Sequence, residues 1–150
     1  KEAAEKMLVS LQVNVSQSMI VGVHVRRGDF LTVESQLLGY NTPATSYYIK
    51  AFDYMNSTFP NRNITFLIVS DDPPWCKANL VGTNVITAPP AQPDVHIAVL
   101  ASCEHVIISS GTYGWWGAWL AGGHVIYFTD YLRGSTPLGK DFAPKDYYPN

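Results

Sequence analysis

The chain has 150 residues, of which 47% are hydrophobic and 15% are charged, so it forms one ordinary globular domain and not a disordered segment. Its net charge of -2 and its isoelectric point near 6.0 argue against a nucleic-acid or membrane surface. It contains no apolar run of the about 20 residues that a membrane span needs, and no signal-peptide pattern at its start, so we expect this chain to be soluble.

Short apolar strands and helical patterns alternate along the chain. In order, the patterns predict helix 1–11, strand 19–25, helix 46–55, strand 64–70, a short helix after residue 74, strand 84–87, helix 94–102, strand 106–109, a helix after residue 112 and strand 124–129. Residues 39–43 are expected in a polar loop, 88–93 in a surface loop, and the tail after residue 131 is expected to be irregular. Five strands with helices between them predict an α/β, Rossmann-like parallel sheet with helices on both faces.

Two adjacent arginines follow the first predicted strand. Arg26 and Arg27 are two of only four arginines in the chain, and they fall at the carboxyl end of strand 19–25. Ligands of open α/β sheets bind at that end, and the planar guanidinium group of arginine grips phosphate through two bonds. The sequence therefore predicts a phosphorylated ligand.

A glycine-containing turn leads from strand 106–109 into the next helix. In SSGTYGWWGAWLAGG, residues 109–123, Gly111 and Gly114 let the backbone approach a phosphate, and the start of the helix offers free N–H groups. The spacing is GxxGxxG, which differs from the dinucleotide fingerprint GxGxxG. A helix rich in aromatic residues is more often part of the hydrophobic core than of a binding site. Together with the two arginines, however, this turn favours a phosphate-binding site.

N-glycosylation motifs and cysteines indicate the cellular compartment of the protein. Asn14, Asn56 and Asn63 each begin an acceptor triplet for N-glycosylation, which favours a lumenal or secreted chain. Cys76 and Cys103 have no CxxC spacing, so one disulfide is allowed, and two buried thiols are the simpler interpretation.

No metal site is expected from the sequence. The four histidines form no HxxxH pair. Adjacent carboxylates such as Asp71 and Asp72 bind metal in other proteins, but the prolines that follow them favour a helix cap for Asp72.

Three segments together resemble a known family. HVRRGDF at 24–30, SDDPPWCKANL at 70–80 and ISSGTYGWWGAWLAGG at 108–123 resemble the α-1,2-fucosyltransferases, and the match runs from about residue 19 to residue 148. These inverting enzymes transfer L-fucose from GDP-fucose to a galactose 2-hydroxyl on a glycan. The resemblance implies that residues 1–150 are the C-terminal, donor-binding half of a type B glycosyltransferase, which needs no metal or other cofactor.

The resemblance also implies partners and a location. The partners would be GDP-fucose and a galactose-terminated glycan, with no nucleic acid. The acceptor-binding N-terminal half is absent from this chain, so we expect the chain alone to be inactive and to expose an apolar patch. The full-length protein would be a single-pass type II membrane protein of the Golgi lumen.

The arginines receive a role from the resemblance. Arg26 and Arg27 would hold the diphosphate and stabilise the charge that grows on the leaving GDP. The alternative is a surface ion pair with Asp29.

Further donor-binding residues follow from the same resemblance. His24 would lie beside the guanine, unless it is simply a satisfied histidine inside a strand. Asp94 would accept hydrogen bonds from the guanine N1–H and 2-amino groups, or else cap a helix, and Asp71 would lie near the nucleotide. The remaining donor-binding candidates follow the glycine turn: Thr112, Tyr113, Gly114 and Trp115.

The general base has two candidates, and the sequence does not choose between them. Glu34 lies ten residues after His24, which is the spacing of the glutamate proposed as the base in the related α-1,6 family. Asp29 closes the HxRRxD motif but could instead brace an arginine.

Two other function classes stay open. One is a GDP-sugar-binding module or pseudoenzyme without turnover. The other is an NAD-dependent oxidoreductase, against which the missing GxGxxG counts.

Overall fold

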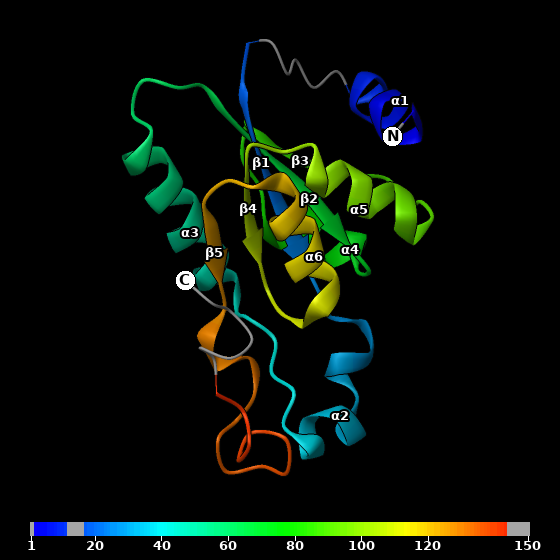
Figure 1. Cartoon of the computed structure of the whole chain (residues 1–150), viewed down its shortest axis with the longest axis vertical. Coiled ribbons are helices and arrows are strands. Elements are labelled where there is room, and N and C mark those ends of the chain that lie inside the picture. Colours follow the sequence, from blue (N-terminus) through cyan, green and yellow to red (C-terminus); the bar gives the residue numbers. More distant parts are fainter. Residues whose placement is uncertain (1, 12–16, 144–150) are drawn as a thin grey trace.

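The computed structural model of the chain describes residues 2–11 and 17–143, and its centre is a five-stranded parallel sheet (Figure 1). The strand order is β3-β2-β1-β4-β5. The strands are β1 (Met19–Val25), β2 (Ile64–Ser70), β3 (Val85–Thr87), β4 (His105–Ile108) and β5 (Val125–Tyr127). Each neighbouring pair is parallel, which confirms the predicted Rossmann-like sheet. The order reverses between β1 and β4, and a crevice for ligands is expected beyond the carboxyl ends of those two strands.

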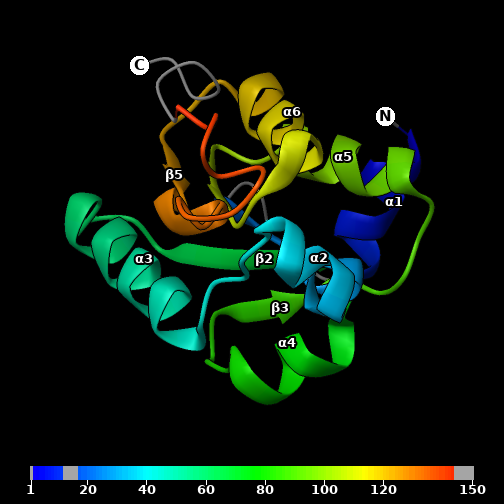
Figure 2. The same cartoon turned by 90° about the horizontal axis from the view of Figure 1, so that it is seen from below.

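Helices cover both faces of the sheet, as the sequence predicts (Figure 2). The helices α3 (Thr45–Thr58) and α4 (Pro73–Asn79) pack on one face. The other face carries α1 (Glu2–Ser10), α5 (Pro93–Ala101) and α6 (Gly111–Ala121). Alternation along β1 explains the two cores, because Val21, Val23 and Val25 lie against α3 and α4, whereas Ile20 points to the other side.

The predicted bounds hold best in the central strands. For β1 and β2 the predicted and observed residues are the same, since both strands are continuous apolar runs buried on both faces. The structure adds the short helices η1 (Gly28–Leu31), α2 (Val33–Leu38) and η2 (Thr129–Tyr131), for which the sequence predicted no regular structure. The helix α2 has only six residues, and none of them is buried, so it contributes nothing to the core.

Two distant segments continue beyond the carboxyl edge of the sheet and lie side by side (Figure 1). We call residues 26–44 and 129–143 the edge layer. Backbone hydrogen bonds tie them together, from Asn41 N–H to Tyr131 O at 3.0 Å, from Arg133 N–H to Gly39 O at 3.0 Å and from Leu138 N–H to Leu38 O at 3.2 Å.

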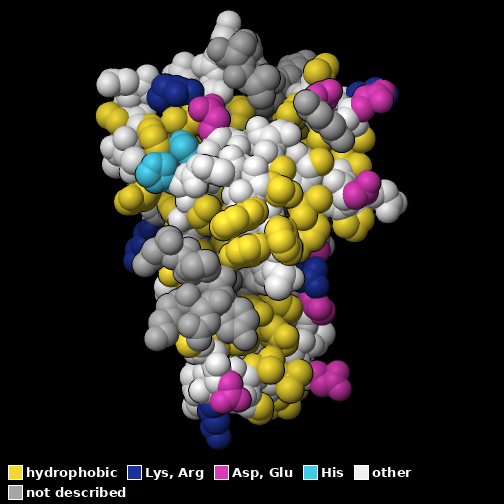
Figure 3. All heavy atoms as spheres, viewed as in Figure 1, with side chains coloured by type: hydrophobic (Ala, Val, Ile, Leu, Met, Phe, Trp, Pro, Cys, Tyr) yellow, Lys and Arg dark blue, Asp and Glu magenta, His cyan; other side chains and the backbone are white. Residues whose placement is uncertain are grey.

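The outer surface of α6 carries exposed aromatic side chains. Trp116 is 51% exposed and Trp119 is 63% exposed, and Leu120 lies beside them in sequence. Figure 3 shows hydrophobic side chains gathered over this helix. An exposed apolar patch is therefore present on α6, and its packing against a further domain stays a prediction.

The two cysteines lie on opposite faces of the sheet. Cys76 packs with the α3 and α4 side, and Cys103 packs with the α5 and α6 side. Both are buried free thiols, which confirms the simpler interpretation and leaves the allowed disulfide unformed.

The surface features bear on the lumenal prediction. Asn56 and Asn63 are exposed, and Asn14 lies outside the described residues. Within the described part of the chain, every helix is too short or too polar to cross a membrane.

Candidate functional site

A pocket of about 640 Å³ opens at the carboxyl edge of the sheet. Its lining comes from the ends of β1 and β2 and the segments just after them, from the start of α6, and from the first turn of α5 and the loop before it. The polar groups that line it are His24, Arg26, Ser70, Asp71, His96 and residues 110–113. This is the crevice that the reversal of strand order predicts.

The start of α6 faces this first pocket without a side-chain cap. Ser110 is the N-cap residue, but its side chain makes no capping hydrogen bond. Its hydroxyl oxygen is buried and has no hydrogen-bond partner among the described residues. Gly111 has a φ of +85°, a conformation that glycine adopts without strain. The free N–H groups and positive helix end form a ready site for an anion.

Arg26 brings a positive charge to the same pocket. Its guanidinium group pairs with Asp29 at 2.6 Å and with Asp71 at 2.9 Å, and its side chain is 37% exposed. Its backbone N–H donates to Ser109 Oγ at 2.8 Å, which fixes the end of β1 against the end of β4. The predicted ion pair with Asp29 is thus present, and the same arginine also lines the pocket.

Arg27 turns away from the pocket. Its Nε donates to Asp72 Oδ2 at 3.1 Å, and its guanidinium carbon lies 3.8 Å from the centre of the Trp75 ring. Asp72 also caps α4 by accepting from Trp75 N–H at 3.2 Å, which confirms the predicted helix cap. The structure therefore separates the two arginines, with Arg26 in the pocket and Arg27 against α4.

His24 lines the pocket and is the second-to-last residue of β1. Its side chain is buried, and its Nδ1 has no hydrogen-bond partner among the described residues. Burial, followed by the charges of Arg26 and His96, lowers the pKa of His24 to about 4. The imidazole is therefore neutral at pH 7. The alternative, a histidine whose ring nitrogens are hydrogen-bonded inside the strand, does not hold for Nδ1.

Gly114 lets α6 pack directly on His24. A Cβ atom at this position would lie well inside contact distance of Nδ1 of the buried His24. We expect Gly114→Ala to lower the free energy of unfolding by about 1–3 kcal/mol through overpacking, and to distort the first pocket. Urea denaturation measures the effect. Gly134→Ala is the control, because a Cβ there meets no atom within 4 Å, and equal stability of the two variants would contradict the expectation.

Other predicted residues lie outside the first pocket. Asp94 is exposed in the first turn of α5, where Gln92 is the N-cap residue, so the capping role considered for Asp94 is wrong. Glu34 is exposed in the first turn of α2, and Asp29 is an exposed partner of Arg26. Their proposed roles toward guanine and acceptor stay predictions.

The residues after the glycine turn divide between two pockets. Thr112 and Tyr113 line the first pocket, and the Tyr113 hydroxyl donates to Pro93 O at the start of α5. Trp115 lines a second pocket of about 360 Å³, which shares Gly111 and Thr112 with the first. The rest of its lining includes Tyr40, Tyr131, Leu138, Asp141 and Phe142, all from the edge layer.

Sequence reasoning missed several lining residues. Phe30 and His96 line the first pocket, and His96 Nε2 lies 2.9 Å from Pro89 O. This contact holds the loop at 88–93, which the sequence predicted as plain surface, against the pocket. The one sequence signal that could have identified His96 as a pocket residue is its position in the first turn of a predicted helix near the edge of the sheet.

No cluster for a metal ion is found among residues 2–11 and 17–143, where no three His, Cys, Asp or Glu side chains lie close enough together. The absence of a metal in the reaction stays a prediction.

Sequence comparisons give a consistent result. Residues 1–143 match the family model described as glycosyl transferase family 11. The chain is 33% identical to a mouse galactoside 2-α-L-fucosyltransferase Sec1, over 99% of this chain and 41% of that protein. It is 35% identical to a galactoside α-(1,2)-fucosyltransferase 2 from Pongo pygmaeus, over 97% of this chain and 43% of that protein. The chain thus spans less than half the length of these relatives.

Solved structures show the same fold at low sequence identity. A NodZ α-1,6-fucosyltransferase soaked with GDP-fucose matches 86% of this chain and 44% of its own, with a TM-score of 0.59 and 17% identity. A POFUT1 structure in complex with GDP matches 86% of this chain and 46% of its own, with a TM-score of 0.58 and 13% identity.

Proposed function

The chain belongs to glycosyl transferase family 11, and on that premise we propose that it is the donor-binding part of an α-1,2-fucosyltransferase. The reaction would move L-fucose from GDP-fucose to the 2-hydroxyl of a galactose on a glycan, with inversion and without a metal. The observation that carries the proposal is the first pocket, where the uncapped start of α6 and Arg26 meet at the switch point of the sheet.

The diphosphate of the donor fits the positive end of this pocket. The N–H groups at residues 111–113 and the guanidinium of Arg26 would share the phosphate oxygens, and Ser110 Oγ would gain a partner. Bond cleavage places negative charge on the leaving GDP. A fixed cation and a helix end stabilise that charge more than they stabilise the bound substrate, which is the requirement for catalysis.

The guanosine would extend toward the other end of the first pocket. His24, His96 and the Tyr113 ring line this pocket, with the His24 and Tyr113 ring centres 5.4 Å apart. A neutral His24 offers one donor and one acceptor nitrogen, which suits the edge of a base. Arg27 would act by holding α4 and the end of β1 in place.

The full-length protein would supply what this chain lacks. The chain covers 41% of the Sec1 relative, so the acceptor-binding half and a membrane anchor would lie in the remainder. Asp29 and Glu34 remain the proposed bases. A Golgi-lumen location with glycans on Asn14, Asn56 and Asn63 completes the proposal.

A nucleotide panel tests the donor assignment. GDP and GDP-fucose are expected to raise the melting temperature of the full-length protein, whereas UDP, ADP and NAD leave it unchanged, because the donor of the proposed reaction carries guanine. A metal chelator is expected to have no effect on transfer. Calorimetry with equal affinities for UDP and GDP would reject the guanine assignment, and transfer that strictly requires Mn²⁺ would reject the metal-independent reaction.

A further inference from the structure

The second pocket has an aromatic lining gathered from three parts of the chain. Tyr40 follows α2, Trp115 lies on α6, and Tyr131 and Phe142 come from the carboxyl-terminal segment of the edge layer. The ring centres of Tyr40 and Tyr131 are 5.9 Å apart, and those of Tyr131 and Phe142 are 5.6 Å apart with nearly perpendicular planes. Ligand pockets with a volume of about 300 Å³ or more commonly have such apolar linings with a few polar groups.

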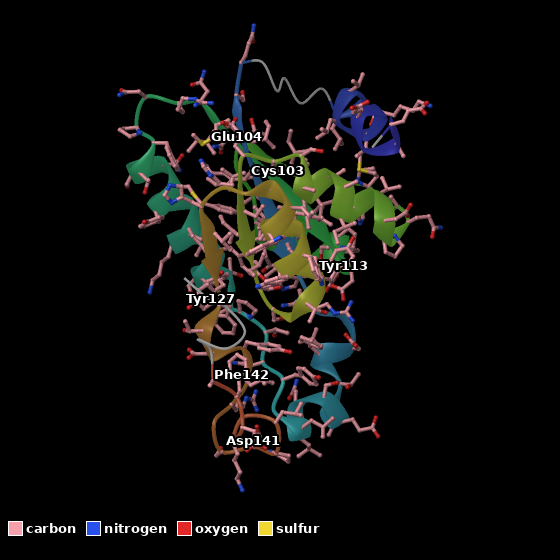
Figure 4. The ribbon with its side chains drawn as sticks, viewed as in Figure 1. Cys103, Glu104, Tyr113, Tyr127, Asp141 and Phe142 are labelled. Carbon is pink, nitrogen blue, oxygen red and sulfur yellow. The ribbon has the colours of Figure 1, made fainter. Side chains whose placement is uncertain are left out.

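Asp141 supplies the charged group of this pocket. Figure 4 shows Asp141 and Phe142 in the segment beyond the sheet edge, below Tyr127 at the end of β5. Among the described residues that line the second pocket, none is lysine or arginine. A carboxylate accepts hydrogen bonds from hydroxyl groups and repels phosphate, so this lining suits a neutral ligand rich in hydroxyl groups.

Aromatic rings and a carboxylate together match the chemistry of a sugar ring. A pyranose has an apolar face of C–H groups that packs on an aromatic ring, and a rim of hydroxyl groups that donate to a carboxylate. Thr112 adds a short hydroxyl side chain at the boundary with the first pocket.

The two pockets meet at the start of α6. Gly111 and Thr112 line both, and Phe30 of the first pocket stacks on Tyr40 of the second with ring centres 4.3 Å apart. A diphosphate bound at the α6 start would therefore place the group attached to it at the entrance of the second pocket.

We propose that the second pocket is a pyranose subsite, in which Asp141 binds sugar hydroxyls and the aromatic rings hold the C–H face. The source of the ring rests on the proposed function, and it is either the fucosyl group of the donor or the galactosyl group of the acceptor. The chemistry is the same in both cases, and the experiment separates them.

Two variants of the full-length protein probe this subsite. Asp141→Asn removes the charge, and Leu138→Trp fills the space with a side chain that starts 38% exposed, while the backbone bond from Leu138 to Leu38 is retained. Asp130→Asn is the matched control, because this acidic residue lies in the same segment and does not line the second pocket. The measurements are the affinities for GDP and GDP-fucose, the KM for a β-galactoside, and saturation-transfer NMR with methyl α-L-fucoside and methyl β-D-galactoside.

Both pocket variants are expected to bind GDP as well as the wild type does. A fall of about tenfold in GDP-fucose affinity identifies the fucosyl ring, and a rise of about tenfold in the galactoside KM identifies the acceptor ring. If the pocket variants match the control in all of these, the subsite proposal is overturned. If the wild type binds no guanine nucleotide, the proposed function fails, and the NMR decides alone: a sugar signal lost in Leu138→Trp supports the subsite, and no signal from either sugar overturns it.

Discussion

Replacing Arg26 with alanine is expected to lower kcat/KM for fucosyl transfer by about a hundredfold or more, with the fold intact. Arg26 lines the first pocket, and its guanidinium group contacts the exposed carboxylate of Asp29, the carboxylate of Asp71 and the ring of Phe30. In the proposed reaction, its loss would remove a cation that stabilises the charge on the leaving GDP. Arg26→Lys keeps the charge but loses the planar fork, so a fall of about tenfold is expected.

The Arg26 experiment has an internal comparison. Arg62→Ala removes an arginine that pairs with Glu104 at 3.1 Å near the opposite edge of the sheet, and it is expected to leave transfer unchanged. Arg27→Ala removes the contact with Trp75 and the bond to Asp72, so we expect it to lower stability as well as activity. Steady-state assays of the full-length protein with GDP-fucose and a β-galactoside measure the effects, and a normal rate for Arg26→Lys would make the phosphate role wrong.

The stability of the protein is expected to fall by about 3 kcal/mol between pH 6.5 and pH 4 through His24 alone. Burial lowers the pKa of His24 from its ordinary value of 6.5 to about 4 in the folded protein. Between these two values the unfolded chain binds a proton at this position and the folded chain does not. The contribution is therefore complete above pH 6.5 and is lost as the pH falls toward 4.

Urea denaturation at pH 7.0 and pH 4.5 measures this loss. His24→Asn carries no titrating group at this position, so its stability is expected to depend less steeply on pH than that of the wild type. His105 also has a pKa lowered by burial and by His124, and it contributes equally to both proteins. The same pH dependence in wild type and variant would show that His24 is protonated to the same extent in the folded and unfolded chains.

The sequence was sufficient where a pattern is local. The strands β1 and β2 are runs of seven residues that are buried almost throughout, and such runs are visible without any tertiary information. Likewise, Arg26 and Thr112 follow the ends of β1 and β4, and the rule for ligands of parallel sheets places them together.

The sequence was insufficient where position depends on a distant contact. Arg26 and Arg27 are adjacent, and only the presence of Trp75 and Asp72 from another segment explains why one lines the pocket and the other does not. The edge layer depends on the pairing of Tyr40 with Leu132. These residues lie far apart in the chain, and no local sequence pattern predicts that they pair.

The backbone bonds that join the edge layer have a consequence for how this part of the molecule can evolve. The two segments are tied by main-chain groups of Leu38, Gly39 and Asn41 to Leu138, Arg133 and Tyr131. Hydrogen bonds between main-chain groups are retained when most side chains are substituted. Gly39 is an exception, because its φ is +123° and a Cβ there would clash with Thr136. Substitutions of its lining side chains can therefore change the shape and polarity of the second pocket one residue at a time, while the main-chain bonds keep its wall in place.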